Sequence, residues 1–242
     1  MWRRITGLSV AILFICGSSA LAQKTQGQEF SPYLPAPGDR RETVQLNHAC
    51  KNIQNSYECA QAVEKKQLPR YPQLVSRQGG TLRLALKSGG GVELKDVAAN
   101  DEKDTYYSFR EFFPDLGYYL VHVQYFEGDA YLMVNHQTGE RFTLHDLFLL
   151  SPDRKRLATL SLDLEAGYNP NGVQIWGITP EKMTLEWNYE SKEWGPSHGA
   201  WKDNDTLIFS KTALDKQYNL VRRGALMVRK DPTGWRLSPA KP

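Results

Sequence analysis

The chain has 242 residues, of which 30 are basic and 27 acidic. It lacks the basic excess or basic stripe that is typical of proteins binding nucleic acids or membrane surfaces. After the first 22 residues, no apolar run approaches the roughly 20 residues needed to span a bilayer. The composition therefore predicts a soluble globular protein that does not bind nucleic acids and has no integral membrane segment once a leader is removed.

The first 22 residues have the three parts of a secretory signal peptide. Arg3 and Arg4 form a basic start, residues 8–16 are apolar, and small residues lead to Ala22. This order predicts cleavage after Ala22. An uncleaved anchor is the alternative, but the apolar run is only about half the length of a membrane span. We expect a mature chain of 220 residues, which is 242 less 22, in a bacterial periplasm or secreted.

Two cysteines, Cys50 and Cys59, remain after cleavage, and an even pair in an oxidising compartment predicts a disulfide. On one continuous helix they would lie about 13 Å apart along the axis. A disulfide needs Cα atoms within about 7 Å. The chain must therefore turn between them, and Ser56 can cap a helix over residues 57–68 that has Cys59 in its first turn. Metal binding by the two thiolates is the weaker alternative.

The mature chain divides into three parts. Residues 23–46 are polar and contain prolines, which favours an extended tether. Residues 47–70 hold the helix and form a small disulfide-linked cap. Residues 71–242 carry short alternating runs separated by turn residues, which is typical of an antiparallel all-β meander. The expected strands lie at 81–86, 92–94, 118–126, 130–135, 141–144, 157–162, 173–178, 183–189, 199–202, 206–210, 220–229 and 234–237.

Alternation also predicts which strand faces are packed. In residues 183–189 the odd-numbered positions are apolar and the even-numbered ones polar, so one face should pack and the other should be solvated. In residues 173–178 both faces carry apolar side chains. That strand is therefore expected to be covered on both sides.

Part of the β region resembles a known family. Residues 150–158 read LSPDRKRLA and are similar to the turn and strand that open a blade in WD-repeat and related β-propellers. Residues 173–176 read VQIW and resemble a later strand of such a blade, although Gly177 stands where the family often has Asp. Residues 199–209 could begin a second blade. The resemblance, limited to about residues 147–210, implies four-stranded meandering sheets. A β-sandwich built from the same hairpins is the alternative.

Residues 163–172 form the most unusual loop, because they interrupt the meander with oxygen donors and turn formers. Asp163 and Glu165 offer carboxylates and Asn169 and Asn171 offer amide oxygens, which are ligands that calcium accepts. The alternative is a long hairpin loop whose side chains bond their own backbone. Tyr168 adds an aromatic ring to the same loop. We regard calcium as a candidate cofactor here, although the spacing is not that of an EF-hand.

A second candidate loop spans residues 190–198 and carries Trp194 and His198, with the packing of Trp194 over the end of the sheet as the alternative.

The histidines have no zinc-binding spacing, and no serine or cysteine nucleophile motif is present. Asp163 and Glu165 could lie on one strand face, as in glycosidases.

The sequence thus favours an exported, non-enzymatic binding protein that uses both loops to recognise an unknown protein or glycan of the cell envelope. A periplasmic hydrolase acting on carbohydrate or cell-wall material is the alternative.

Overall fold

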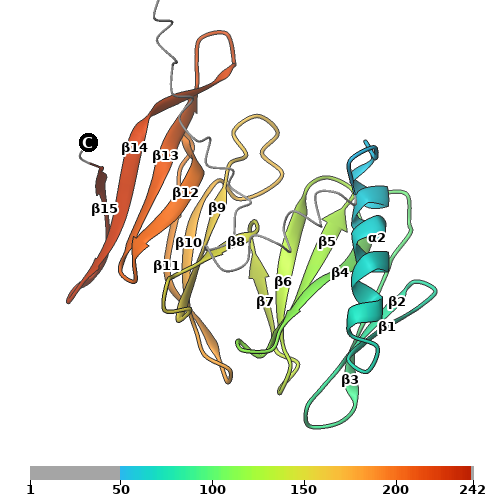
Figure 1. The fold of residues 1–242 in the computed structure, drawn as a ribbon. Helices are drawn as coiled ribbons and strands as arrows, with labels where there is room; N and C mark the ends of the chain where they lie inside the picture. The colour runs from blue at the N-terminus through green and yellow to red at the C-terminus, as the bar shows by residue number, and fades with distance from the viewer. Residues whose placement is uncertain (1–49, 241–242) are drawn as a thin grey trace, which may run out of the picture.

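A computed structural model describes residues 50–240, which form one short helical segment and four antiparallel sheets arranged in a row (Figure 1). Each sheet is a meander, since its strands follow one another in chain order. The structure therefore confirms an all-β antiparallel fold with a disulfide-linked helix before it. The expected signal peptide and tether lie outside the described residues.

We name the sheets A to D in chain order. Sheet A contains β1 (Val75–Gln78), β2 (Thr81–Ala85) and β3 (Gly91–Lys95). Sheet B contains β4 (Thr105–Phe113), β5 (Tyr118–Tyr125), β6 (Asp129–Asn135) and β7 (Arg141–Leu144). Sheet C contains β8 (Phe148–Leu150), β9 (Arg156–Ser161), β10 (Gly172–Ile178) and β11 (Met183–Glu190). Sheet D contains β12 (Gly195–Asp203), β13 (Thr206–Leu214), β14 (Leu220–Asp231) and β15 (Gly234–Pro239).

Three hydrophobic cores hold the row together, one between each pair of successive sheets. The core between sheets A and B includes Leu82, Leu84, Phe109, Tyr119 and Val121. The core between B and C includes Tyr118, Met133, Leu144, Leu157 and Met183. The core between C and D includes Val173, Ile175, Leu207, Phe209 and Val228. Sheets B and C are therefore covered on both faces, as in stacked blades rather than in a two-sheet sandwich.

The last strand of sheet C corrects one expectation. A β-bulge shifts the pairing of β10 with β11, so that Ile175 pairs with Trp187 while Trp176 pairs with Leu185. The extra residue reverses the faces, because one inserted position breaks the two-residue period. Met183 packs between B and C, Trp187 packs between C and D, and Leu185 is 42% exposed. The expectation of one continuous apolar face along residues 183–189 was wrong.

The bulged residue, Glu186, joins sheet C to sheet D. Its carboxylate accepts hydrogen bonds from Arg156 Nε, Lys230 Nζ and Trp235 Nε1 at 3.1, 2.7 and 2.9 Å. Burial alone would raise the pKa of Glu186, but these donors and the two cations hold it below its ordinary value. The bulge therefore places a charged link between the two sheets where alternation would have left a solvated glutamate.

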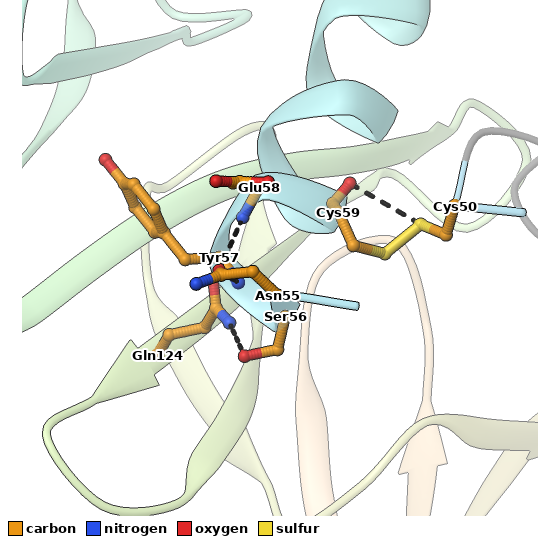
Figure 2. The surroundings of a disulfide bond; sticks show 7 residues. All are labelled: Cys50, Asn55, Ser56, Tyr57, Glu58, Cys59 and Gln124. Carbon is orange, nitrogen blue, oxygen red and sulfur yellow. Dashed lines mark hydrogen bonds between the residues drawn. A yellow bond between two sulfur atoms is a disulfide. The ribbon is translucent and has the colours of Figure 1, made fainter. Parts of the chain in front are cut away.

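Helix α2 (Ser56–Gln67), followed by the 3-10 turn η1 (Leu68–Arg70), begins one residue from the expected start. Its cap is Asn55, whose Oδ1 accepts the backbone N–H groups of Tyr57 and Glu58, and not Ser56 as expected (Figure 2). Ser56 Oγ instead accepts a bond from Gln124 of sheet B. The Cys50–Cys59 disulfide is confirmed, with 5.1 Å between the Cα atoms.

The helix protects the free edge of sheet B. Strand β4 is one of the two edge strands of sheet B, and α2 lies along it (Figure 1). Glu64 Oε2 accepts Phe109 N–H at 2.7 Å, Asp96 Oδ1 accepts Tyr107 N–H at 2.9 Å, and Arg77 donates to the carbonyl of Tyr107. These side chains satisfy backbone groups that a neighbouring strand would otherwise pair.

Arg77 holds this edge network together. Its guanidinium makes a two-pronged pair with Glu64, with both N–O distances 2.8 Å, and an ion pair with Asp96 at 3.2 Å. The side chains of Arg77 and Glu64 are only 18% and 9% exposed. Removing the cation would leave two poorly solvated carboxylates without their partner, which is costly.

We therefore expect Arg77→Met to lower the free energy of unfolding by about 2–4 kcal/mol, measured by urea denaturation. The matched control is Arg83→Met, because Arg83 lies exposed on strand β2 of the same sheet. The control should change stability by no more than about 0.5 kcal/mol. Equal effects of the two variants would contradict the edge-protecting role.

Candidate functional site

The interface between sheets B and C is apolar at one end and polar at the other. The polar end continues the strand faces that carry the apolar core, so its side chains are buried or half-buried between the two sheets. We call it the B–C polar cluster. It is made by Arg110, His122, Gln124, Asp129 and Tyr131 of sheet B, His145 and Asp146 of the β7–β8 connection, and Thr159, Ser161 and Gln174 of sheet C. Buried polar groups concentrated in this way are costly unless hydrogen bonded.

A hydrogen-bonded chain runs from this cluster to the 163–172 loop. His122 is 7% exposed, stacks on Tyr131, and its Nε2 lies 2.6 Å from Asp129 Oδ2. Asp129 Oδ1 accepts a hydrogen bond from Asn169 Nδ2 at 3.2 Å. Asp129 therefore connects a buried imidazole in sheet B to a loop that extends from sheet C.

The protonation states of this pair follow from burial. Burial lowers the pKa of His122 and outweighs the opposing effect of Asp129. Burial would raise the pKa of Asp129, but its bonds with His122 and Asn169 hold it lower. A neutral imidazole thus donates its Nε2–H to a carboxylate, which leaves His122 Nδ1 as an acceptor.

Asp146 is the most perturbed acid in the cluster. Burial raises its pKa to about 7, against a weaker lowering effect from the backbone N–H of Leu147, while the charge of Asp129 raises it further. The Leu147 N–H lies 2.6 Å from Asp146 Oδ1. A carboxyl group that titrates near neutrality inside a sheet interface is a candidate functional group.

Unpartnered polar atoms also gather here. Among the residues that the structure describes, five buried side-chain nitrogen or oxygen atoms have no hydrogen-bond partner. Four belong to the B–C polar cluster: Arg110 Nη1, His122 Nδ1, Gln124 Oε1 and His145 Nδ1. Buried polar atoms in native proteins usually bond to protein groups or to ordered water, so these four atoms are available to water or to a bound group.

The 163–172 loop is organised by its own side chains. Asp163 accepts the backbone N–H groups of Ala166, Gly167 and Asn169 at 3.2, 2.8 and 2.7 Å. Asn171 accepts Asp163 N–H and donates to the carbonyls of Ser191 and Trp194. Burial would raise the pKa of Asp163, but the backbone donors hold it below its ordinary value. Asp163 and Asn171 thus hold the loop in shape and tie it to the 190–198 segment.

Exposed aromatic rings lie where this loop meets the β5–β6 turn. Tyr168 is 53% exposed, and Tyr125 and Phe126 are 43% and 59% exposed. The contact depends on Gly128 at a φ of +80°, because a Cβ there would lie 2.8 Å from Asn169 Oδ1 and 3.0 Å from Tyr168 Cβ. We call Tyr125, Phe126 and Tyr168 the aromatic rim.

The remaining predicted residues lie apart from one another. Trp194 is only 6% exposed and stacks between Tyr189 and Phe209, with ring centroids 5.6 and 6.2 Å away. His198 is exposed at a φ of +47° in the bulged part of β12. Glu165 is exposed in the loop. The structure therefore brings Tyr168 and Asn169 to the polar junction of sheets B and C, but places Trp194 in the core between sheets C and D.

A second polar feature is a cavity of about 310 Å³ beside the edge network of Arg77, Glu64 and Asp96. Tyr57 and Tyr107 line it as well. Its charged groups already bond one another and the edge of β4. We therefore assign these groups to holding the helix on the sheet.

Residues 50–240 contain no group of three or more His, Cys, Asp or Glu side chains placed to hold a metal ion. Within the same range, no helix is long and apolar enough to cross a membrane.

Sequence reasoning missed His122, Asp129 and Asp146 as members of one site. It considered His122 only as one of five histidines without a zinc-binding spacing, and it gave no reason to join His122 to the 163–172 loop. The only sequence signal was the position of His122 and Gln124 among the apolar residues of β5. Polar residues within a strand that is buried on both faces could have indicated a polar interface.

Comparisons with known proteins identify no family. No protein-family model matches the chain, and no curated protein matches it. Among solved structures, the chain is similar to one from a structural and mechanistic analysis of two prolyl endopeptidases, with 15% identity and a TM-score of 0.31. The match covers 85% of this chain and 36% of the other, so the chain spans about a third of that protein.

We expect Asp146→Asn to stabilise the protein at neutral and alkaline pH. The pKa in the folded state is about 7, against an ordinary value of 3.8, so stability from the protonated carboxyl is full below about pH 4 and is lost as the pH rises through 7. Asparagine mimics the neutral form. The gain should be absent at pH 4 and reach about 2–4 kcal/mol by pH 8.

Urea denaturation across this pH range measures the difference, with Glu165→Gln as the exposed-carboxylate control. A gain that is the same at pH 4 and pH 8, or an equal gain in the control, would contradict the assignment.

Proposed function

We propose that the protein is an exported binding protein whose recognition surface is the aromatic rim above the B–C polar cluster. The observation that carries the proposal is the exposure of three aromatic rings on segments that are held rigidly in place. Isolated exposed rings are common on protein surfaces, but three exposed rings on two segments that meet are typical of recognition sites.

Contacts and hydrogen bonds fix the loop that carries Tyr168. Tyr168 is held by the contact of its loop with Gly128, and Asn169 is fixed by Asp129. The loop itself is closed by the backbone bonds of Asp163. A preorganised surface loses little conformational entropy on binding, which favours recognition.

The chemistry of the rim fits a glycan or a protein segment of the cell envelope. Aromatic faces pack against the apolar faces of sugars or against side chains, and the exposed carboxylates of Glu127 and Glu165 can accept hydrogen bonds. Export is supported by the signal-like first 22 residues of the sequence and by the Cys50–Cys59 disulfide.

The hydrolase alternative gains no support from Asp163 and Glu165. The lowered pKa of Asp163 does not suit a general acid. Its carboxylate oxygens also accept three backbone N–H groups, so they are already engaged in holding the loop. We therefore propose neither glycoside hydrolysis nor calcium binding for this loop.

The proposal predicts that the double variant Phe126→Ala/Tyr168→Ala loses its partner. Truncating an aromatic residue at the centre of an interface can cost more than about 1 kcal/mol, so the affinity should fall about fivefold or more per ring. The measurement is capture of envelope proteins from periplasmic extract together with binding to an array of cell-wall glycans, both compared with the native chain.

The matched control is Tyr218→Ala, because Tyr218 is 79% exposed in the β13–β14 turn of sheet D. The control should bind like the native chain, and both variants should melt within about 1 °C of it, since surface truncations scarcely change stability. Unchanged binding by Phe126→Ala/Tyr168→Ala would remove the rim from consideration.

A further inference from the structure

Charge is unevenly distributed along the row of sheets. Residues 195–240, which contain sheet D, hold eight Lys or Arg against four Asp or Glu. Residues 50–194, with the helix and the other sheets, hold sixteen against twenty. The near-neutral total therefore conceals a basic sheet at one end of the molecule, with a formal charge of +4, and an acidic remainder of −4.

Three of the six exposed cations in residues 195–240 lie at the β13–β14 turn. We call residues 214–223 the β13–β14 tip. Lys216, Arg222 and Arg223 are exposed there, and none makes an ion pair with another residue in the described part of the chain. The one acid of the tip, Asp215, accepts the backbone N–H groups of Gln217 and Asn219 at 2.8 and 2.9 Å. Three cations are thus exposed at the tip against one carboxylate, which closes the turn and interacts electrostatically with Arg223.

The tip also carries exposed apolar side chains among these cations. Tyr218 is 79% exposed and Leu220 is 41% exposed. The hairpin extends past the neighbouring strands at the edge of the row (Figure 1), so a flat surface could meet it before it meets the other described strands.

We infer that the β13–β14 tip docks onto the surface of a phospholipid bilayer that contains anionic lipids. Cations near an anionic bilayer gain electrostatic attraction, while a tyrosine ring and an aliphatic side chain can enter the headgroup region. A soluble polyanion would engage the cations alone and would give Tyr218 and Leu220 no role. The combination therefore favours a bilayer surface over a polyanion.

The test measures co-sedimentation of the mature chain with vesicles of phosphatidylcholine containing about one-quarter phosphatidylglycerol, against vesicles of pure phosphatidylcholine. We expect binding to the anionic vesicles only, and weaker binding as ionic strength rises. Arg222→Glu/Arg223→Glu should reduce binding at least about tenfold, because each cation contributes appreciably near such a surface. Tyr218→Ala/Leu220→Ala should reduce it by about threefold or more, leaving the salt dependence intact.

The matched control is Arg83→Glu/Lys95→Glu, which makes the same change of net charge on exposed positions of sheet A and should bind like the native chain. No binding by the native chain, equal binding to neutral vesicles, or an equal loss in this control would overturn the inference. Binding that falls with the arginine changes but is unaffected by Tyr218→Ala/Leu220→Ala would overturn it in favour of a polyanion site. Vesicle binding is independent of the aromatic rim, so Phe126→Ala/Tyr168→Ala should retain it.

Discussion

Face-to-face burial of successive sheets is the constraint on which the rest of the structure depends. An isolated meander of three or four short strands buries too little apolar surface to be stable in water. Stacking gives sheets B and C an apolar neighbour on each face. The loops that leave these two sheets are therefore anchored in the best-packed part of the molecule, and the aromatic rim lies where two of them meet.

Stacking covers the faces of the sheets but leaves their edge strands unpaired, and side chains outside the apolar cores bond to these edges. A meander has free edges, and β4 would present unpaired backbone groups to solvent. Helix α2, fixed at its start by Asn55 and the disulfide, brings Glu64 to that edge, where Arg77 and Asp96 complete the pairing. At the other end of the row, Glu186 links sheet C to sheet D through Arg156, Lys230 and Trp235. Ionic contacts thus pair the free edge of β4 and link sheet C to sheet D, where apolar packing alone would not satisfy the polar groups.

The B–C polar cluster differs from the three apolar cores, because placing titratable groups between two sheets lowers the stability of the fold. Asp146 is half-buried with a raised pKa, and His122 is held neutral beside Asp129. A purely structural interface would gain stability by replacing such groups with apolar side chains. Their position directly under the loop that carries Tyr168 connects the unfavourable burial to the proposed recognition surface.

Much of the fold could be predicted because alternation and turn residues are local signals. All twelve expected strands form, and ten of them lie within two residues of their expected bounds. The tight turn at Ser151 forms as the SPD pattern predicts, with Ser151 Oγ donating to Asp153 Oδ1 at 2.7 Å. Strands β1, β4 and β8 were missed, since β1 is short and polar and β4 contains a bulge that disturbs its alternation.

The site was harder to predict because its parts are far apart in the chain. Asp129 and Asn169 are forty residues apart, and no local pattern shows that they meet. The pairing of Arg77 with Glu64 depends on how the helix lies against β4, which periodicity does not determine. The bulge at Glu186 moved Trp187 to the opposite face, so even a correct strand gave a wrong surface.

Native-state hydrogen exchange tests the central claim most directly. Strands β2, β5 and β10 are each the middle or an inner strand of a sheet, but only β5 and β10 belong to sheets that are covered on both faces. If stacking stabilises the molecule, the amides of β5 and β10 should exchange most slowly and those of β2 faster by about tenfold or more. Exchange from β5 and β10 that is as fast as that from β2 would contradict the stacked arrangement.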